Sequence, residues 1–350
     1  MSIGSHETHY NELHKTFSYS RIAKCLCVSV LTIVFSGCVS TTLEVPSRGE
    51  IALSTELLSE MRAKDMTPND PILIRIFKRE SELEVWKRSN TGQYDLLKTF
   101  AMCRWSGQLG PKKAEGDRQA PEGIYHVGLS GLNPKSRYYL SFDLGFPNRL
   151  ERAKGYTGSA LMVHGACSSS GCFAISDESI AEVYALVREA LRAGQKSVQV
   201  QSLPFRMTSE NLARVIDNPN YQFWLDLKEA SDRFELTRQI PEVNYCEGRY
   251  RFGKTVNAKV TSDPLAACPE FEPMPELVAE KATSDLFAAK LLATEISNYA
   301  LSYVDGGMHP SYRNILKRAD GAKLLAKKTS KTLVPISQPE AALADPYIPE

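Results

Sequence analysis

Segments in which apolar and polar residues alternate, with the period of a β-strand, begin near residue 70. Residues 72–78 are apolar and β-branched, and residues 82–87 alternate strictly, so this pair predicts a β-hairpin. Short apolar runs between turn-forming Gly, Pro and Asn residues predict further strands. These lie at residues 94–100, 124–127, 138–142, 161–163 and 198–201.

Helical periodicity dominates the later part of the chain. From Ser176, a good N-cap, apolar residues recur at helical spacing until Gly194. Beyond Pro204, helices are predicted at residues 211–216, 221–234 and 277–299. Together with a partly apolar helix before Pro68, this pattern predicts an α+β protein: a β-rich domain followed by an α-helical C-terminal extension.

The same patterns divide the chain into five parts. We expect a signal segment at residues 1–37, a tether with a short helix at 38–70 and the β-rich domain at 71–203. The helical extension follows at 204–326. Residues 327–350 are rich in Lys, Ser, Pro and Ala with little apolar periodicity, which predicts a disordered tail.

The N-terminus has the layout of an export signal. Arg21 and Lys24 precede an apolar run that ends in Ser36-Gly37-Cys38. Its 13 residues, 25–37, are too few to cross a bilayer core of about 30 Å as a helix. The ending resembles a bacterial lipobox, which implies lipidation of Cys38 and attachment to the inner leaflet of the outer membrane, facing the periplasm. An ordinary secretory signal and an uncleaved anchor stay open.

Charge and cysteine content limit the possible functions. The net charge of +1 and the lack of a basic stripe interleaved with aromatics argue against nucleic acid as a partner. Five cysteines follow Cys38, so at least one is unpaired in an oxidising compartment. Cys246 and Cys268, which are close in sequence, are the preferred disulfide.

The remaining cysteines include a candidate nucleophile. A predicted strand ends in His164-Gly165, and Ser169-Ser170-Gly171-Cys172 follows after a polar loop. A thiol needs help to ionise near neutral pH, and His164 is the nearest base. Gly171 permits a sharp turn that exposes the sulfur and aims backbone N–H groups at a developing oxyanion.

Three other interpretations fit these residues. Cys167 and Cys172 could form a short disulfide. His164, Cys167 and Cys172 could contribute to a zinc site, although neither His126 nor His309 supplies a convincing fourth ligand. His164 could also be an ordinary buried histidine beside a small core cysteine. The residues alone leave all of these open.

The motif as a whole resembles the catalytic signature of the YkuD-type L,D-transpeptidase domain, and the similarity to the YafK-like branch of that family covers residues 71–246. Besides residues 163–173, the segments that carry the resemblance are 107–112, 115–117, 120–125, 132–134, 141–148 and 158–165.

The resemblance implies acyl transfer on peptidoglycan stem peptides without a metal or other cofactor. Cys172 would attack the carbonyl at the L-centre of diaminopimelate to form a thioester, with His164 as general base and acid and Gly171 shaping the oxyanion turn. An amine acceptor would give a cross-link or an anchored protein, and water would give a cut. Hydrolysis that releases a wall-bound Braun-type lipoprotein is one alternative. A catalytically silent peptidoglycan-binding lipoprotein is another.

One departure from the wider family concerns the substrate carboxylate. Many members have Arg two residues after the nucleophile, where this chain has Ala174. Arg152, Lys154 and Tyr156 could supply substrate contacts instead, and a solvated charged loop is the competing interpretation. Ser169-Ser170 could contact substrate or only hydrogen-bond the loop.

Overall fold

The computed structural model describes residues 47–256, 262–295 and 302–347. The predicted signal segment and Cys38 lie outside the described residues, as do residues 348–350. Within the described part, no helix has both the length and the apolar character needed to cross a membrane.

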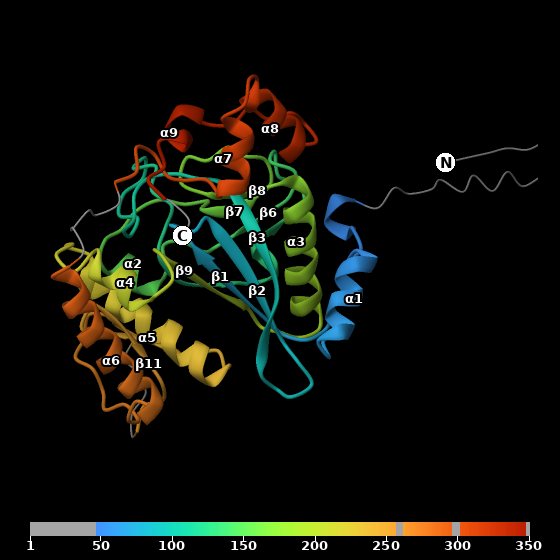
Figure 1. Cartoon of the computed structure of the whole chain (residues 1–350). Coiled ribbons are helices and arrows are strands. Elements are labelled where there is room, and N and C mark those ends of the chain that lie inside the picture. Colours follow the sequence, from blue (N-terminus) through green and yellow to red (C-terminus); the bar gives the residue numbers. More distant parts are fainter. Residues whose placement is uncertain (1–46, 257–261, 296–301, 348–350) are drawn as a thin grey trace, which may run out of the picture. The chain divides into compact units, whose positions relative to one another are not determined.

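The centre of the fold is a mixed sheet that has nine strands within the described residues, in the order β4-β9-β1-β2-β3-β8-β7-β6-β5 (Figure 1). The strands are β1 (Ile72–Phe77), β2 (Glu82–Arg88), β3 (Tyr94–Trp105), β4 (Gly123–Val127), β5 (Leu132–Asn133), β6 (Ser141–Asp143), β7 (Met162–His164), β8 (Phe173–Ile175) and β9 (Val198–Leu203). The predicted hairpin is confirmed as β1 and β2. Two short strands, β5 and β8, were not predicted.

Two of the strand pairings are parallel. β1 pairs in parallel with β9, and β7 pairs in parallel with β8, while the other pairs of the large sheet are antiparallel. The β7–β8 pair is formed across a loop of only eight residues, 165–172, which is short for a parallel connection. That loop therefore returns sharply to the edge at which β7 began.

Helix α3 (Asp177–Arg192) contacts the sheet at β1, β6, β7 and β9. Its predicted N-cap is confirmed, since Ser176 Oγ accepts from the Ser179 N–H at 3.1 Å. Helix α1 (Thr55–Ala63) confirms the predicted early helix, and Leu57 and Met61 on it are fully buried in the main core. Residues 47–70 therefore belong to the folded part and are more than a tether, because this helix buries its apolar face against the sheet.

The extension after β9 is mainly helical. Its elements are α4 (Ser209–Ala213), α5 (Tyr221–Thr237), β10 (Val243–Cys246), β11 (Arg249–Phe252) and α6 (Glu276–Ala293), whereas α2 (Arg149–Ala153) belongs to the preceding domain. α5 contacts α6, β11 and β9, around a second core that contains Trp224. The hairpin β10–β11 was not predicted. Cys246 and Cys268 are bonded, as expected.

The expectation of a disordered tail at residues 327–350 is wrong for the described residues up to 347. Helix α9 (Pro339–Leu343) and the last residues of α8 (Gly321–Thr329) lie in this range, and α7 (Pro310–Leu316) precedes them; all three are at the red end of the chain in Figure 1. Leu325, Ile336 and Ala342 are buried in one cluster with the Cys103–Cys167 disulfide. The few apolar residues of this segment are enough to give it a folded structure, because they pack against the core around the disulfide.

Candidate active site

Cys172 is the one cysteine of the described residues that has no disulfide partner. Cys167 is bonded to Cys103, which lies 64 positions earlier on β3. This pairing excludes the short Cys167–Cys172 disulfide that the sequence allowed. It also takes Cys167 out of any zinc site, and the described residues contain no group of three or more His, Cys, Asp or Glu side chains placed to hold a metal ion.

The strand register brings Cys172 and His164 to the same face of the sheet. In the parallel β7–β8 pair His164 lies opposite Ala174, so Cys172 lies beside Met162. The Met162 N–H is 3.5 Å from Cys172 Sγ. Side chains alternate along a strand, so residues 162 and 164 point to one side, and the thiol shares that side with the imidazole. The register thus places the two residues predicted to carry the chemistry on one face of the sheet.

His164 is held in one orientation by its surroundings. Its Nδ1 lies 2.6 Å from the Gly165 carbonyl oxygen, and its ring stacks on Tyr138 with 4.7 Å between centroids. A carbonyl oxygen only accepts, so Nδ1 carries the proton and Nε2 keeps a free lone pair. Burial lowers the pKa of His164 to about 4, and the bond to Gly165 opposes this only in part. The imidazole is therefore neutral at neutral pH and able to accept a proton.

The thiol is neutral as well. Burial raises the pKa of Cys172 above its ordinary value, and the nearby charge of Asp143 acts in the same direction. The Met162 N–H and the charge of Lys112 oppose these effects. Site chemistry therefore starts from a thiol and a neutral imidazole, so proton transfer has to accompany the attack of sulfur on a carbonyl.

The turn before the nucleophile is built around Ser169. Gly171 has a φ of +132°, a conformation that favours glycine, as its predicted role as a turn residue requires. Ser169 Oγ accepts from the N–H groups of Gly171 and Cys172 at 3.4 and 3.2 Å and donates to the Cys172 carbonyl at 2.7 Å. The amides expected to face an oxyanion are thus used here to hold the loop. Ser169 is buried, whereas Ser170 is exposed.

The C-terminal region braces this turn, which sequence reasoning missed. The Ser169 N–H donates to Ser337 Oγ at 2.9 Å, and Ser337 Oγ lies 3.3 Å from the Ser169 carbonyl. Arg118 bridges the Ser169 carbonyl at 3.3 Å and the Asp305 carboxylate at 2.7 Å. We define residues 330–338 as the C-terminal brace. Because this segment was predicted to be disordered, its contact with the Ser169 turn was not expected.

Two of the candidate substrate contacts, Arg152 in α2 and Tyr156 just after it, lie outside the loop that carries Cys172. Arg152 is exposed, and its guanidinium donates to the Pro147 carbonyl. Tyr156 is half-buried and lines a cavity of about 210 Å³ together with Lys154 and Glu151. Burial raises the pKa of that Glu151 to about 7. Ala174 is fully buried, so no cation stands at the position where the wider family has Arg.

The chain resembles known proteins over most of its sheet. The L,D-transpeptidase catalytic domain model, YkuD, matches residues 73–200. YafK of Escherichia coli strain K12, whose name as an L,D-transpeptidase is provisional, is 42% identical over 204 residues, which are 58% of this chain and 82% of YafK. The chain belongs to the YkuD L,D-transpeptidase family. YafK of Escherichia coli O157:H7 has the same identity and coverage. The YkuD family is peptidoglycan-related, and this chain shares that general role.

Solved structures give a more distant comparison. The helical cell shape determining protein Pgp2 from Campylobacter jejuni has a TM-score of 0.33 and 19% identity, covering 54% of this chain and 79% of Pgp2. Bd1075 of Bdellovibrio bacteriovorus has a TM-score of 0.29 and 16% identity, covering 48% of this chain and 62% of that protein. This chain thus spans less than two thirds of Bd1075. These scores are too low to support any conclusion about the YkuD family member described here.

Proposed function

We propose that this protein is a cysteine-dependent acyl transferase that acts on peptidoglycan stem peptides. The observation that carries the proposal is the free Cys172 thiol on the same sheet face as His164, whose Nδ1 is tied to the Gly165 carbonyl. This pair lies within the span matched by the L,D-transpeptidase model.

The first half-reaction forms a thioester. Cys172 Sγ attacks the carbonyl carbon at the L-centre of diaminopimelate while its proton passes to His164 Nε2. The C–N bond of the scissile amide then breaks, and the imidazolium returns the proton to the departing amine. The Gly165 carbonyl, which accepts from Nδ1, stabilises the imidazolium between these two steps.

The second half-reaction depends on the acceptor. The amine of another stem peptide gives a cross-link, and water gives hydrolysis. The buried Ala174 favours the hydrolytic alternative, an amidase that releases a wall-bound lipoprotein of the Braun type, because the cation that much of the family carries at this position is missing. Arg152 and Tyr156 are the proposed substrate contacts, with the exposed Ser170 on the nucleophile loop, whereas the buried Ser169 holds that loop through its hydrogen bonds.

The proposal includes a cellular location. Residues 1–37 would direct export, and lipidation of Cys38 would hold the protein at the outer membrane, facing peptidoglycan in the periplasm. Radiolabelled palmitate incorporated by the full-length chain, and lost in Cys38→Ala, tests this part.

The enzymatic part is tested with purified protein and muropeptides. Cys172→Ala should form no product, and His164→Gln should lower the rate roughly 10²- to 10⁴-fold, the usual contribution of a general base. A thioester adduct of imipenem, a carbapenem, should appear by mass spectrometry on Cys172 in the parent protein only. Full activity in Cys172→Ala would disprove the proposal.

A second assay separates the acceptors. The enzyme is incubated with a diaminopimelate stem linked to a lysine peptide, with and without an added stem peptide as amine donor. Hydrolysis alone in both mixtures identifies an amidase, and a new cross-linked product identifies a transpeptidase. Absence of both products and of the imipenem adduct would instead indicate a silent binding module.

A further inference from the structure

The peptide group between Gly165 and Ala166 is held at both ends. Its carbonyl oxygen lies 2.6 Å from His164 Nδ1, and its N–H donates to Asp177 Oδ1 at 3.0 Å. The oxygen and the N–H belong to one planar unit, so a group that fixes one end also fixes the other. Asp177 is thus linked to the proposed general base through a single peptide group.

Asp177 is packed tightly in this position. It is 2% exposed, and its second oxygen, Oδ2, accepts from the Lys331 N–H of the C-terminal brace at 2.6 Å. A Cβ at Gly165 would lie only 2.5 Å from Asp177 Oδ1, so glycine is needed for this approach. Both carboxylate oxygens therefore have a backbone donor, one from the His164 loop and one from the brace.

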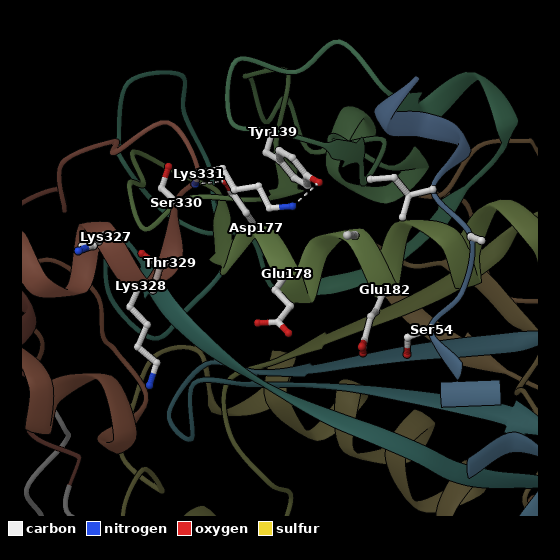
Figure 2. Close-up of a pocket in the computed structure, with 13 residues that line it drawn as sticks. Ser54, Tyr139, Asp177, Glu178, Glu182, Lys327, Lys328, Thr329, Ser330 and Lys331 are labelled. Carbon is white, nitrogen blue, oxygen red and sulfur yellow. Dashed lines mark hydrogen bonds between the residues drawn. The ribbon is translucent and has the colours of Figure 1, made fainter. Parts of the chain in front are cut away.

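The carboxylate is not used as an ordinary helix cap. Asp177 is the first residue of α3, but the cap is made by Ser176, and the Asp177 carboxylate accepts hydrogen bonds from Ala166 and Lys331. Figure 2 shows Asp177 at this helix end, beside Lys331 and Tyr139. These hydrogen bonds indicate that Asp177 holds the loop that follows His164.

The basic side chains of Lys331 and Arg48 act on the Asp177 carboxylate. Burial raises its pKa, and the Lys331 and Ala166 N–H groups and the charges of Lys331 and Arg48 oppose that effect. Lys331 Nζ itself lies 3.1 Å from Tyr139 Oη. Figure 2 marks this contact by a dashed line. A carboxylate bonded to a peptide N–H polarises that peptide group and makes its carbonyl a better acceptor.

We propose that Asp177 is a positioning residue that fixes the tautomer and orientation of His164 through the Gly165–Ala166 peptide group. The inference rests on the proposed function in that His164 serves as the base for Cys172. Asp177 itself touches neither substrate nor the reacting atoms.

The first test is a double-mutant cycle on imipenem acylation of Cys172. Asp177→Asn should slow acylation roughly 10- to 100-fold, the range found when a hydrogen-bond partner that orients a metal-bound histidine is removed. In a His164→Gln background, the same substitution should change the residual rate by less than about 2-fold. An equal loss in both backgrounds would show a merely structural role and overturn the proposal.

The second test does not need turnover. The protein contains six histidines, so ¹⁵N-labelled His signals are assigned to His164 by comparison with His164→Gln. The parent should show a protonated Nδ1 and a free Nε2, and Asp177→Asn should show a mixture of tautomers. An unchanged tautomer in Asp177→Asn would overturn the proposal, even if Cys172 proved not to be the nucleophile.

Glu178→Gln is the matched control. Glu178 is the next residue of α3, is exposed and has the same charge. It should leave both the acylation rate and the His164 tautomer unchanged. If Asp177→Asn fails to fold, Asp177→Glu, which retains the charge on a longer side chain, replaces it, with partial loss expected in both tests. Full parental values in that variant would contradict the requirement for a closely fitted carboxylate.

Discussion

The two disulfides of the described chain lie in regions with different roles. Cys103–Cys167 joins β3 to the loop between His164 and Cys172, whereas Cys246–Cys268 closes a segment of 22 positions around the β10–β11 hairpin. The first bond therefore holds the proposed catalytic loop against the sheet and leaves Cys172 as the free thiol. The second stabilises the extension, away from the loop. Their positions indicate that the first disulfide supports the proposed site, whereas the second supports only the fold of the extension.

Removing the first disulfide should have the largest effect. Closing 64 positions stabilises the fold by about 4 kcal/mol in the chain-entropy model, so Cys103→Ala/Cys167→Ala should lower the free energy of unfolding by about that amount. The loop also loses its anchor, so imipenem acylation of Cys172 should slow by more than about 10-fold under conditions in which the variant stays folded. Urea unfolding and mass spectrometry measure the two effects. Loss of stability with an unchanged acylation rate would remove the distinction between the disulfides.

Removing the second disulfide should be nearly as costly to stability. A loop of 22 positions corresponds to about 3 kcal/mol, so Cys246→Ala/Cys268→Ala should unfold at lower urea concentration. Its acylation rate should stay within about 2-fold of the parent, because no residue of the proposed site lies in this segment. Slow acylation of Cys172 in a fully folded variant would show that the extension does affect the proposed site.

The proposed catalytic region should also be the more sensitive to acid. The pKa of His164 is about 4 in the fold and about 6.5 in the unfolded chain, so the unfolded state binds the proton more readily. The stability contribution is complete above pH 6.5 and is lost as the pH falls toward 4, by about 3 kcal/mol. Urea unfolding at several pH values should show this loss in the parent and in Cys246→Ala/Cys268→Ala, but not in His164→Gln. The same pH dependence of the unfolding free energy in all three proteins would show that other titratable groups cause the loss.

The smallest effect should come from the brace. Ser337→Ala removes the acceptor for the Ser169 N–H, at a cost of about 1–2 kcal/mol of unfolding free energy. Acylation of Cys172 should slow by several-fold, since Ser169 holds the turn before the nucleophile. Ser284→Ala on the exposed face of α6 is the control and should change neither quantity. Equal effects of Ser337→Ala and Ser284→Ala would show that the C-terminal brace does not support the proposed catalytic region.

The sequence predicted much of the sheet, and it indicated the two residues that we propose to react. Strict alternation at residues 82–87 predicted β2, and the His164-Gly165 and Gly171-Cys172 motifs predicted the proposed active pair. β8 was missed because its three residues, Phe173–Ile175, are too few to show a period. Its parallel pairing with β7 is a long-range property of the sheet and not of any local pattern.

The support for the site was much harder to predict. Five cysteines allow many pairings, and nothing near Cys103 or Cys167 indicates that they meet. Ser337 and Lys331 lie in a polar segment that has the composition of a disordered tail, and the hydrogen bond from Lys331 to Asp177 comes from its backbone N–H. Backbone donors have no sequence signature. Asp177 is an acidic residue in the first turn of α3, where such residues are common, so its position in the sequence does not indicate a link to His164.

The contact between Ser169 and Ser337 joins residues 168 positions apart, and synthesis proceeds from the N-terminus. A growing chain that ends before residue 331 lacks both the bond to Asp177 and the bond to Ser169. The sheet strands and all five cysteines after Cys38 are already present by residue 268. The proposed nucleophile is therefore synthesised before the residues that complete its loop, so the site can be completed only after the C-terminal brace has emerged.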